Sequence, residues 1–264
     1  MILAVDSWGY GAAPLVLPAT QSTPEIVVFL SDIHVPYQDT AVLDSAIRLL
    51  KRLKPDRVVL NGDINDFFQL SRFNYGLERM DHLQEEIDEA VKIRQRIRKA
   101  CPDAVVNENE GNHDSRIITY VEKNARALVS LRALEPEHLF GWKDLEIQAF
   151  PGAGFRLRKN FLVKHGTLVR GEAGATAKAE LALAGISGIS GHTHRLATYR
   201  RGGYESRQWT EQGCLCRLDP DYVTGQPNWQ SGIAVGQFST RSDTFHVEEV
   251  HTFNGRLVYG GKEY

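Results

Sequence analysis

Apolar and polar residues alternate along the first half of the chain in blocks that predict strands followed by helices. Short apolar runs over residues 26–30, 58–60 and 104–107 predict buried strands, because they are rich in β-branched residues and too short for helices. Residues 40–53 carry apolar side chains at helical spacing, which predicts an amphipathic helix. The same spacing predicts a longer helix over residues 77–100.

The pattern changes after Pro151, where strands become more frequent. Residues 161–165 predict a strand that ends in a histidine, and the alanine-rich residues 173–184 predict a helix. Residues 186–190 predict a further strand. Strands dominate the remaining residues, and Asn254-Gly255 predicts a tight hairpin turn between two of them.

This order of elements predicts an α/β fold: a four-layer αββα sandwich in which helices flank two mixed β-sheets. Residues 1–24 contain several glycines and prolines without a sustained period, so we expect an irregular N-terminal arm. Residues 25–264 are expected to form the domain itself. Within it, residues 115–150 occupy the position of a helical, substrate-facing insertion.

The composition narrows the function classes. Of 264 residues, 42% are hydrophobic and 24% are charged, which is ordinary for a globular domain. The net charge of -2 indicates no strongly basic footprint for nucleic acid, although a local patch remains open. No apolar run is long enough for a membrane helix, and the first residues do not resemble a secretory signal. Three cysteines suggest a reducing compartment, so we expect a cytoplasmic protein without membrane partners.

Two of the cysteines, Cys214 and Cys216, form a C-x-C pair. On a strand they would point to the same face. A structural zinc ion needs four ligands, so packing is the favoured interpretation of this pair, and a metal site is the alternative.

The segment from Arg57 to Asp66 places two carboxylates, Asp63 and Asp66, after a buried strand and Gly62. In open α/β sheets, ligands bind beyond the carboxyl ends of the strands. The alternative is a turn in which these aspartates cap the next helix.

Four other strand ends carry polar residues of the same kind, and five of the nine histidines lie there. A single histidine at a strand end is usually structural. Together, however, carboxylate, amide and imidazole groups form a ligand set suited to divalent Mn, Fe, Zn or Ni. Including Asp63, the candidates are Asp32, His34, Asp63, Asn112, His113, His165, His192 and His194.

The chain resembles the calcineurin-like metallophosphoesterase superfamily through five motifs in the family's order. They cover residues 32–194 and read Asp32-x-His34, Gly62-Asp63-x-x-Asp66, Gly111-Asn112-His113-Asp114, His165-Gly166 and Gly191-His192-Thr193-His194. The sequence contexts of the third and fifth motifs have the character of compact phage or bacterial members.

The resemblance implies two divalent ions, with Mn²⁺ first and Fe, Zn or Ni as alternatives, that share Asp63. The other ligands of one ion would be Asp32, His34 and His194. Those of the second would be Asn112, His165 and His192. A water held between the ions would lose a proton near neutral pH and attack phosphorus as hydroxide.

The resemblance also gives His113 a role beside the leaving oxygen, as general acid or charge stabiliser. In the phosphoprotein-phosphatase branch, an aspartate at the position of Asp66 orients that histidine. We therefore hypothesise an Asp66–His113 dyad, in which Asp66→Asn lowers turnover without loss of metal. The alternative is that Asp66 caps its own loop.

The chain departs from that branch after Asp66, where Phe67 replaces an arginine that grips the phosphate dianion. The arginines that stand near motifs are Arg116, Arg170 and Arg195, although each is more often a surface charge. The aromatic residues Phe67, Phe68, Phe73 and Tyr75 could stack on a base, although core or lid positions are commoner for them.

These departures favour hydrolysis of phosphodiesters, with a nucleic acid or nucleotide as the substrate class. A phosphomonoesterase acting on a small metabolite or phosphopeptide is the alternative. A third interpretation is a catalytically silent protein-interaction scaffold. That interpretation expects eroded metal ligands or a missing His113, and neither is seen.

Overall fold

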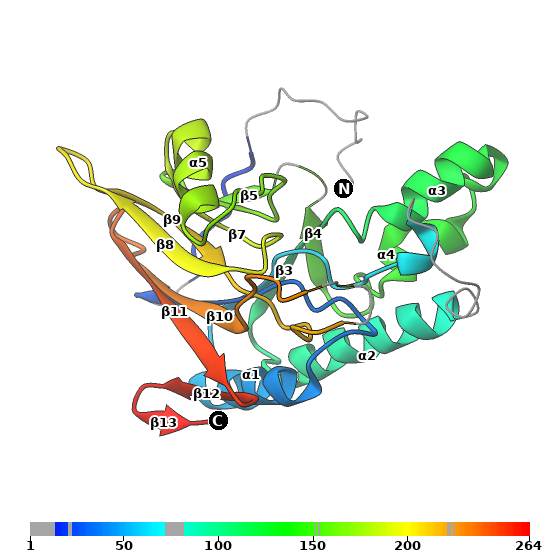
Figure 1. The fold of residues 1–264 in the computed structure, drawn as a ribbon, viewed down its shortest axis with the longest axis horizontal. Coiled ribbons are helices and arrows are strands. Elements are labelled where there is room, and N and C mark those ends of the chain that lie inside the picture. The colour runs from blue at the N-terminus through cyan, green and yellow to red at the C-terminus, as the bar shows by residue number, and fades with distance from the viewer. Residues whose placement is uncertain are drawn as a thin grey trace.

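The structure is a computed structural model that describes residues 14–20, 23–71, 82–150, 152, 154–220, 223 and 225–264. Figure 1 shows two β-sheets packed against each other, with helices outside them. Among the described residues, no helix is both long and apolar enough to cross a membrane.

The larger sheet has eight strands among the described residues, in the order β13-β12-β11-β10-β1-β2-β3-β4. Strands β1 to β4 run parallel to one another, and β10 pairs antiparallel with β1. The bounds are β1 Glu25–Leu30, β2 Arg57–Leu60, β3 Val105–Asn109, β4 Ile147–Phe150, β10 Gly232–Phe238, β11 Phe245–Phe253, β12 Arg256–Tyr259 and β13 Lys262–Glu263.

The smaller sheet has five strands within the described ranges, in the order β5-β6-β7-β9-β8. Strands β6, β7 and β9 are parallel, whereas β5 and β8 pair antiparallel at the two edges. The bounds are β5 Phe155–Arg158, β6 Phe161–Lys164, β7 Ser187–Ser190, β8 Leu196–Arg201 and β9 Arg207–Gln212.

Three apolar clusters separate the layers. Val28 and Leu60 belong to the cluster between the larger sheet and helices α1 (Thr40–Leu53) and α2 (Leu83–Ala100). Phe29 and Phe161 belong to the cluster between the two sheets. Helix α5 (Ala175–Ala184) packs on the smaller sheet around Trp209. The predicted sandwich of two mixed sheets with outer helices is confirmed (Figure 1).

Helix α1 has the bounds that its apolar spacing predicts. The Asp39 carboxylate accepts hydrogen bonds from the backbone N–H groups of Ala41 and Val42, which satisfies two donors at the start of the helix. Lys54 ends the helix in a left-handed conformation with φ of 48°. The predicted hairpin is also present, because Asn254 and Gly255 join β11 to β12 with φ of 49° and 75°.

Two helical predictions differ from the structure. Helix α2 begins at Leu83, and residues 77–81 of the predicted helix lie outside the described part of the chain. The helical region after residue 115 consists of short pieces. Ile117 and Leu139 near its ends pack in a small separate cluster around Phe140, whereas apolar side chains between them, such as Leu131, are exposed. Its elements are α3 Arg116–Asn124, the 3₁₀ turns η3 Arg126–Leu128 and η4 Arg132–Leu134, and α4 Pro136–Leu139.

Part of the predicted N-terminal arm pairs with the sheet. Leu17 is buried and its N–H donates to the Arg156 carbonyl, while the Arg156 N–H donates to the Leu15 carbonyl. Residues 1–13, 21 and 22 of that arm lie outside the described residues. A further 3₁₀ turn, η1 (Phe68–Leu70), follows the motif that contains Asp63.

Candidate metal centre

The predicted ligands lie on loops that follow five strands. Asp32 follows β1, Asp63 follows β2 and Asn112 follows β3 in the larger sheet, and these three strands are parallel neighbours. His165 follows β6 and His192 follows β7, which are parallel neighbours in the smaller sheet. Parallel strands present their carboxyl ends at one edge, so each sheet gathers its polar loops there.

Five predicted ligands have left-handed backbone conformations. These are Asp32, His34, Asp63, His192 and His194, with φ of 52°, 50°, 52°, 69° and 56°. Such conformations are uncommon for residues other than glycine and cost about 1–3 kcal/mol each. Their concentration in these loops indicates that the surrounding structure holds the side chains in place for a function.

Two motif glycines allow the loops to meet. A Cβ atom at Gly111 would overlap the Asp63 carboxylate, and one at Gly191 would overlap the side chains of Ser31 and Asp32. A larger residue at either position would therefore push the candidate ligands apart.

One group of ligands, which we call the buried half, consists of Asp32, His34 and His194. The two Nε2 atoms of the histidines are 3.0 Å apart. Asp32 Oδ1 lies 3.2 Å from His194 Nε2 and 3.8 Å from His34 Nε2. All three side chains are buried, and their ligand atoms converge closely enough to hold one ion.

A second group, the open half, consists of Asn112, His165 and His192. Asn112 Oδ1 is 3.2 Å from His165 Nε2, and the ring centroids of the two histidines are 5.3 Å apart. His165 and His192 form a further metal-competent cluster with Asp63. His165 is buried, His192 is half-buried and Asn112 is exposed, so this half faces solvent.

Asp63 lies between the two halves. Its Oδ2 atom is 3.1 Å from His165 Nε2 and 3.7 Å from His34 Nε2. Its Oδ1 atom accepts a hydrogen bond of 2.8 Å from the His113 N–H, which fixes the carboxylate. One oxygen of Asp63 therefore faces ligands of both halves, a position from which it could be shared by two ions.

Polar groups behind two of the histidines select the nitrogen that faces the centre. His34 Nδ1 is 3.0 Å from Asp66 Oδ2, and His165 Nδ1 is 2.8 Å from the Asn61 carbonyl. When Nδ1 donates to such an acceptor, Nε2 is left as the free lone pair that a metal ion needs. The residues present thus fit two ions.

Electrostatics support the same assignment. Burial opposes ionisation of Asp63, but His165 and His113 hold the pKa of this carboxyl well below its ordinary value. Burial lowers the pKa of His165, but the Asp63 carboxylate raises it by a larger amount, so that the pKa is about 9. Burial and His165 lower the pKa of His192 to about 4. The Asp63 carboxylate attracts positive charge into the centre, and divalent ions would replace the protons on the histidines there.

The structure brings His113 and Asp66 together, but Asp66 also has a second partner. His113 Nδ1 is 2.9 Å from the Asp66 carbonyl oxygen and 3.4 Å from Oδ2 of its carboxylate. The same Oδ2 atom is closer to His34 Nδ1, at 3.0 Å. Asp66 therefore contacts both His113 and a candidate metal ligand, so its substitution would affect both.

Among the three arginines near motifs, Arg116 is the one with contacts to His113 and Asp66. Its Nη2 lies 3.0 Å from His113 Nε2, and its Nη1 donates to the Asp66 carbonyl at 2.8 Å. In contrast, Arg195 donates to the backbone carbonyls of Asn228 and Arg170.

Two supporting residues were missed by the sequence interpretation. Asp114 accepts hydrogen bonds from the N–H groups of Asn65 and Gly111, and it thereby links the two loops that carry Asp63 and Asn112. Asn61 holds His165 through its carbonyl. Both residues stand beside motif residues in the sequence, which marks them as candidates. Sequence position alone does not reveal their hydrogen-bond partners.

The aromatic residues after Asp66 do not form a stacking surface among the described residues. Phe67 is fully buried and packs with Phe140, so the core interpretation of Phe67 is confirmed. Phe68 opens η1 and is half-buried. Phe73 and Tyr75 lie outside the described part of the chain.

Comparisons with known proteins give distant similarities. No family model matches the chain. The chain is 28% identical over 249 residues to the Gene 54 protein of Mycobacterium phage D29, covering 89% of this chain and 96% of that protein. It is 27% identical over 252 residues to the Gene 54 protein of Mycobacterium phage L5, covering 89% and 97%.

Solved structures similar to this chain include vacuolar protein sorting 29 from Cryptosporidium parvum. The TM-score is 0.41 at 12% identity, over 92% of this chain and 99% of that one. The protein of the same name from Chaetomium thermophilum has a TM-score of 0.39 at 12% identity, over 85% and 96%. These similarities are remote.

Proposed function

We propose that the protein is a dinuclear metal-dependent phosphoester hydrolase of the calcineurin-like metallophosphoesterase superfamily. The observation that supports this most is the position of Asp63 Oδ2, 3.1 Å from His165 Nε2 and 3.7 Å from His34 Nε2. A shared carboxylate offsets the repulsion between two dications, and neutral imidazole and amide ligands leave the ions electrophilic.

The buried half and Asp63 would hold one ion, and the open half and Asp63 would hold the other. When bound, two such ions supply Lewis acidity toward a phosphoryl oxygen and activate water near neutral pH. Mn²⁺ is our first choice, with Fe, Zn or Ni as alternatives, because the ligands are all oxygen and nitrogen atoms.

His113 stands beside the centre without being one of the assigned ligands. Its N–H fixes Asp63, its Nδ1 contacts Asp66, and its Nε2 faces the Arg116 guanidinium. Its side chain is 19% exposed, so the ring is accessible to substrate. When substrate displaces the Arg116 contact, Nε2 of His113 can hold a proton. We assign that nitrogen the transfer of the proton to the leaving oxygen, or the stabilisation of the charge that develops there.

A phosphodiester is the substrate class we favour, with nucleic acid or nucleotides as the source. Phe67 is buried where the phosphoprotein-phosphatase branch has its dianion-binding arginine, so this chain lacks that fixed clamp. A diester carries one negative charge at its phosphate, which needs less cationic binding than the dianion of a monoester. The free state of all three cysteines supports a reducing, cytoplasmic setting.

The experiment is reconstitution of the metal-free protein with Mn²⁺, followed by assays on bis-p-nitrophenyl phosphate and p-nitrophenyl phosphate. We expect faster hydrolysis of the diester. A marked preference for the monoester would reverse the substrate class, and no activity on either substrate with Mn, Fe, Ni or Zn would contradict the enzyme proposal.

Arg116 favours one alternative, a phosphomonoesterase. Its guanidinium lies 3.0 Å from His113 and its side chain is 23% exposed, so it could supply the missing contact to a dianion. Arg116→Ala separates the two substrate classes. In a monoesterase this variant loses monoester hydrolysis by about 10- to 100-fold with a raised KM, whereas a diesterase retains its KM.

A further inference from the structure

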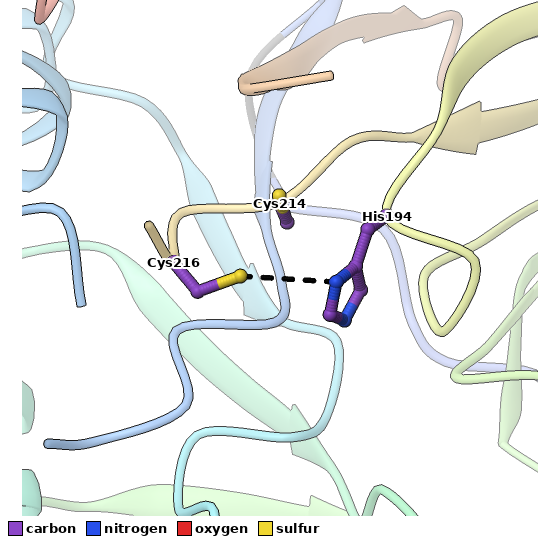
Figure 2. Close-up of side chains that lie close together, drawn as sticks. All are labelled: His194, Cys214 and Cys216. Atoms are coloured by element: carbon purple, nitrogen blue, oxygen red, sulfur yellow. Dashed lines mark hydrogen bonds between the residues drawn. The ribbon is translucent and has the colours of Figure 1, made fainter. Parts of the chain in front are cut away.

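Nδ1 of His194 faces the buried thiol of Cys216 rather than the carboxylates of the candidate centre, and Cys214 lies in the same cluster. Figure 2 shows Cys214, Cys216 and His194 close together, with the thiol of Cys216 pointing toward the imidazole. Cys216 Sγ is 3.8 Å from His194 Nδ1, and the three ligand atoms all lie within 4.8 Å of one another. The fold thus adds a third ligand to a pair for which the sequence alone favours packing over a metal site.

The backbone holds these residues in fixed positions. The Gln230 N–H donates to the His194 carbonyl at 2.7 Å, and the Cys214 N–H donates to the Gln230 carbonyl at 3.2 Å. The Leu215 N–H donates to the Asp32 carbonyl at 3.1 Å. The cysteines are 0% and 1% exposed, so few conformational states would be lost when an ion binds.

The ligand types and spacing suit a borderline-soft cation. Zinc binds thiolate at about 2.3 Å and imidazole nitrogen at about 2.0 Å in a tetrahedron, so sulfur and nitrogen ligands of one ion lie roughly 3.5 Å apart. The Cys216–His194 separation of 3.8 Å is close to that value. Three protein ligands suffice for a zinc ion whose fourth position is taken by water. The Gln230 carbonyl, 3.6 Å from Cys214 Sγ, already accepts from the Cys214 N–H.

We propose that Cys214, Cys216 and Nδ1 of His194 form a separate site for one thiophilic divalent cation, with Zn²⁺ as the natural ion. Binding forms two metal–sulfur bonds and one metal–nitrogen bond. It releases the two thiol protons to solvent, together with the Nδ1 proton of His194 when Nε2 is also engaged. Two thiolates neutralise the dication, which suits a buried site.

This cation site does not depend on the proposed hydrolase activity, although the cation site and the candidate metal centre both use His194. Nε2 of the same ring lies 3.2 Å from Asp32 Oδ1, on the side of the buried half. An ion on Nδ1 would hold the His194 ring in the orientation that directs Nε2 toward Asp32. The thiophilic site is therefore adjacent to the candidate catalytic centre and chemically distinct from it.

The test is titration of the reduced, metal-free protein with Cd²⁺, a spectroscopic substitute for Zn²⁺, while ultraviolet thiolate-to-metal absorption is recorded. We expect one equivalent of Cd²⁺ to produce the absorption in the wild type. Zn²⁺ should abolish it by displacement. Cys101→Ser is the matched control, because Cys101 is also buried but lies at the end of α2, and it should leave the signal intact.

Cys214→Ser and Cys216→Ser should each remove most of the absorption, with circular dichroism confirming that the variants are folded. Absence of the signal in folded Cys101→Ser protein would overturn the proposal, even if the other variants failed to fold. Retention of the full signal in the double variant Cys214→Ser/Cys216→Ser would also overturn it. Mn²⁺-dependent phosphoester hydrolysis, measured separately, distinguishes failure of this site from failure of the hydrolase proposal.

Discussion

The buried half and the open half of the candidate centre use similar ligands in different surroundings. Asp32 and His34 are 0% and 1% exposed, and Asp66 lies behind His34. In the open half, His192 is half-buried and Asn112 is exposed. Both halves meet at Asp63, whose Oδ2 faces a histidine of each.

This difference indicates a division of roles between two ions. Each half has a polar group behind one histidine, but Asp66 behind His34 is a carboxylate, whereas Asn61 behind His165 presents a neutral carbonyl. A charged partner strengthens a ligand more, so the ion of the buried half should be held more tightly. An exposed, neutral amide ligand binds more weakly and leaves space for solvent and substrate. We expect the open half to exchange its ion more readily and to bind the substrate oxygen.

Removing the shared ligand should have the largest effect. Asp63→Asn takes away the negative charge that lies between the halves, so both ions should bind more weakly. We expect hydrolysis to fall by at least about 100-fold, because the electrostatic stabilisation supplied by metal ions is worth several kcal/mol. Metal analysis and assays with bis-p-nitrophenyl phosphate check this. Asp103→Asn, on an exposed turn, is the control and should change neither the metal content nor the rate of hydrolysis.

Weakening the support of the buried half should have the next largest effect. Asp66→Asn removes the charge behind His34, and we expect about a 10- to 100-fold loss of affinity for the tighter ion. This expectation differs from that of a simple Asp66–His113 dyad, in which metal content is unchanged. Calorimetric titration with Mn²⁺ distinguishes them: an unaltered tight-binding phase would show that Asp66 acts on His113 alone.

Changing the open half should have a smaller effect. Asn112→Ala removes one neutral, exposed ligand, so we expect about a 10-fold weaker binding of the second ion. Excess Mn²⁺ should restore most of the turnover, and the tighter ion should remain. Asn124→Ala alters another exposed asparagine and serves as the control. An equal loss of both ions from Asn112→Ala would contradict the division into halves.

The smallest effect on turnover is expected from Glu86, which supports the loop after Asp66. Its carboxylate accepts a hydrogen bond of 2.7 Å from the Phe67 N–H, and burial raises its pKa from 4.5 to about 8. The folded state therefore binds this proton more tightly than the unfolded state. The contribution to the free energy of unfolding decreases by about 1 kcal/mol per pH unit as pH rises from about 4.5 to about 8.

Glu86→Gln should remove this pH dependence of the free energy of unfolding. The free energy of unfolding of the variant should therefore rise relative to that of the wild type between about pH 4.5 and about pH 8. Chemical denaturation at several pH values measures it, and turnover with saturating Mn²⁺ should change little. Glu85→Gln is the matched control, because its side chain is 78% exposed. A constant difference between wild type and Glu86→Gln at all pH values would show that Glu86 does not retain its proton in the folded protein.

Local chemistry explains which parts of the fold were predictable. The bounds of α1 follow from apolar spacing, and the β11–β12 turn follows from Asn254-Gly255, because both depend on neighbouring residues alone. The short pieces between residues 116 and 139 were predicted only as helical. The ends of this region pack around Phe140 with side chains distant in the sequence, such as Ile87, and a local pattern does not specify such packing.

The candidate site could likewise be predicted only in part from the sequence. The motifs identify residues that the structure brings together, since strand-end positions in parallel sheets converge by topology. The partners behind them were not predictable. Asp66 reaches His34 across 32 positions of the chain, and Cys216 reaches His194 across 22. Such contacts depend on loop conformations, including the left-handed residues Asp32 and His34, that no local pattern specifies.

Electron paramagnetic resonance of the Mn²⁺-loaded protein tests the shared role of Asp63 most directly. Two manganese ions joined by one carboxylate should give a spectrum with exchange coupling at two equivalents per chain. In Asp63→Asn that coupling should be absent. A spectrum of isolated, uncoupled ions in the wild type at two equivalents, or full coupling in Asp63→Asn, would contradict a centre built around this residue.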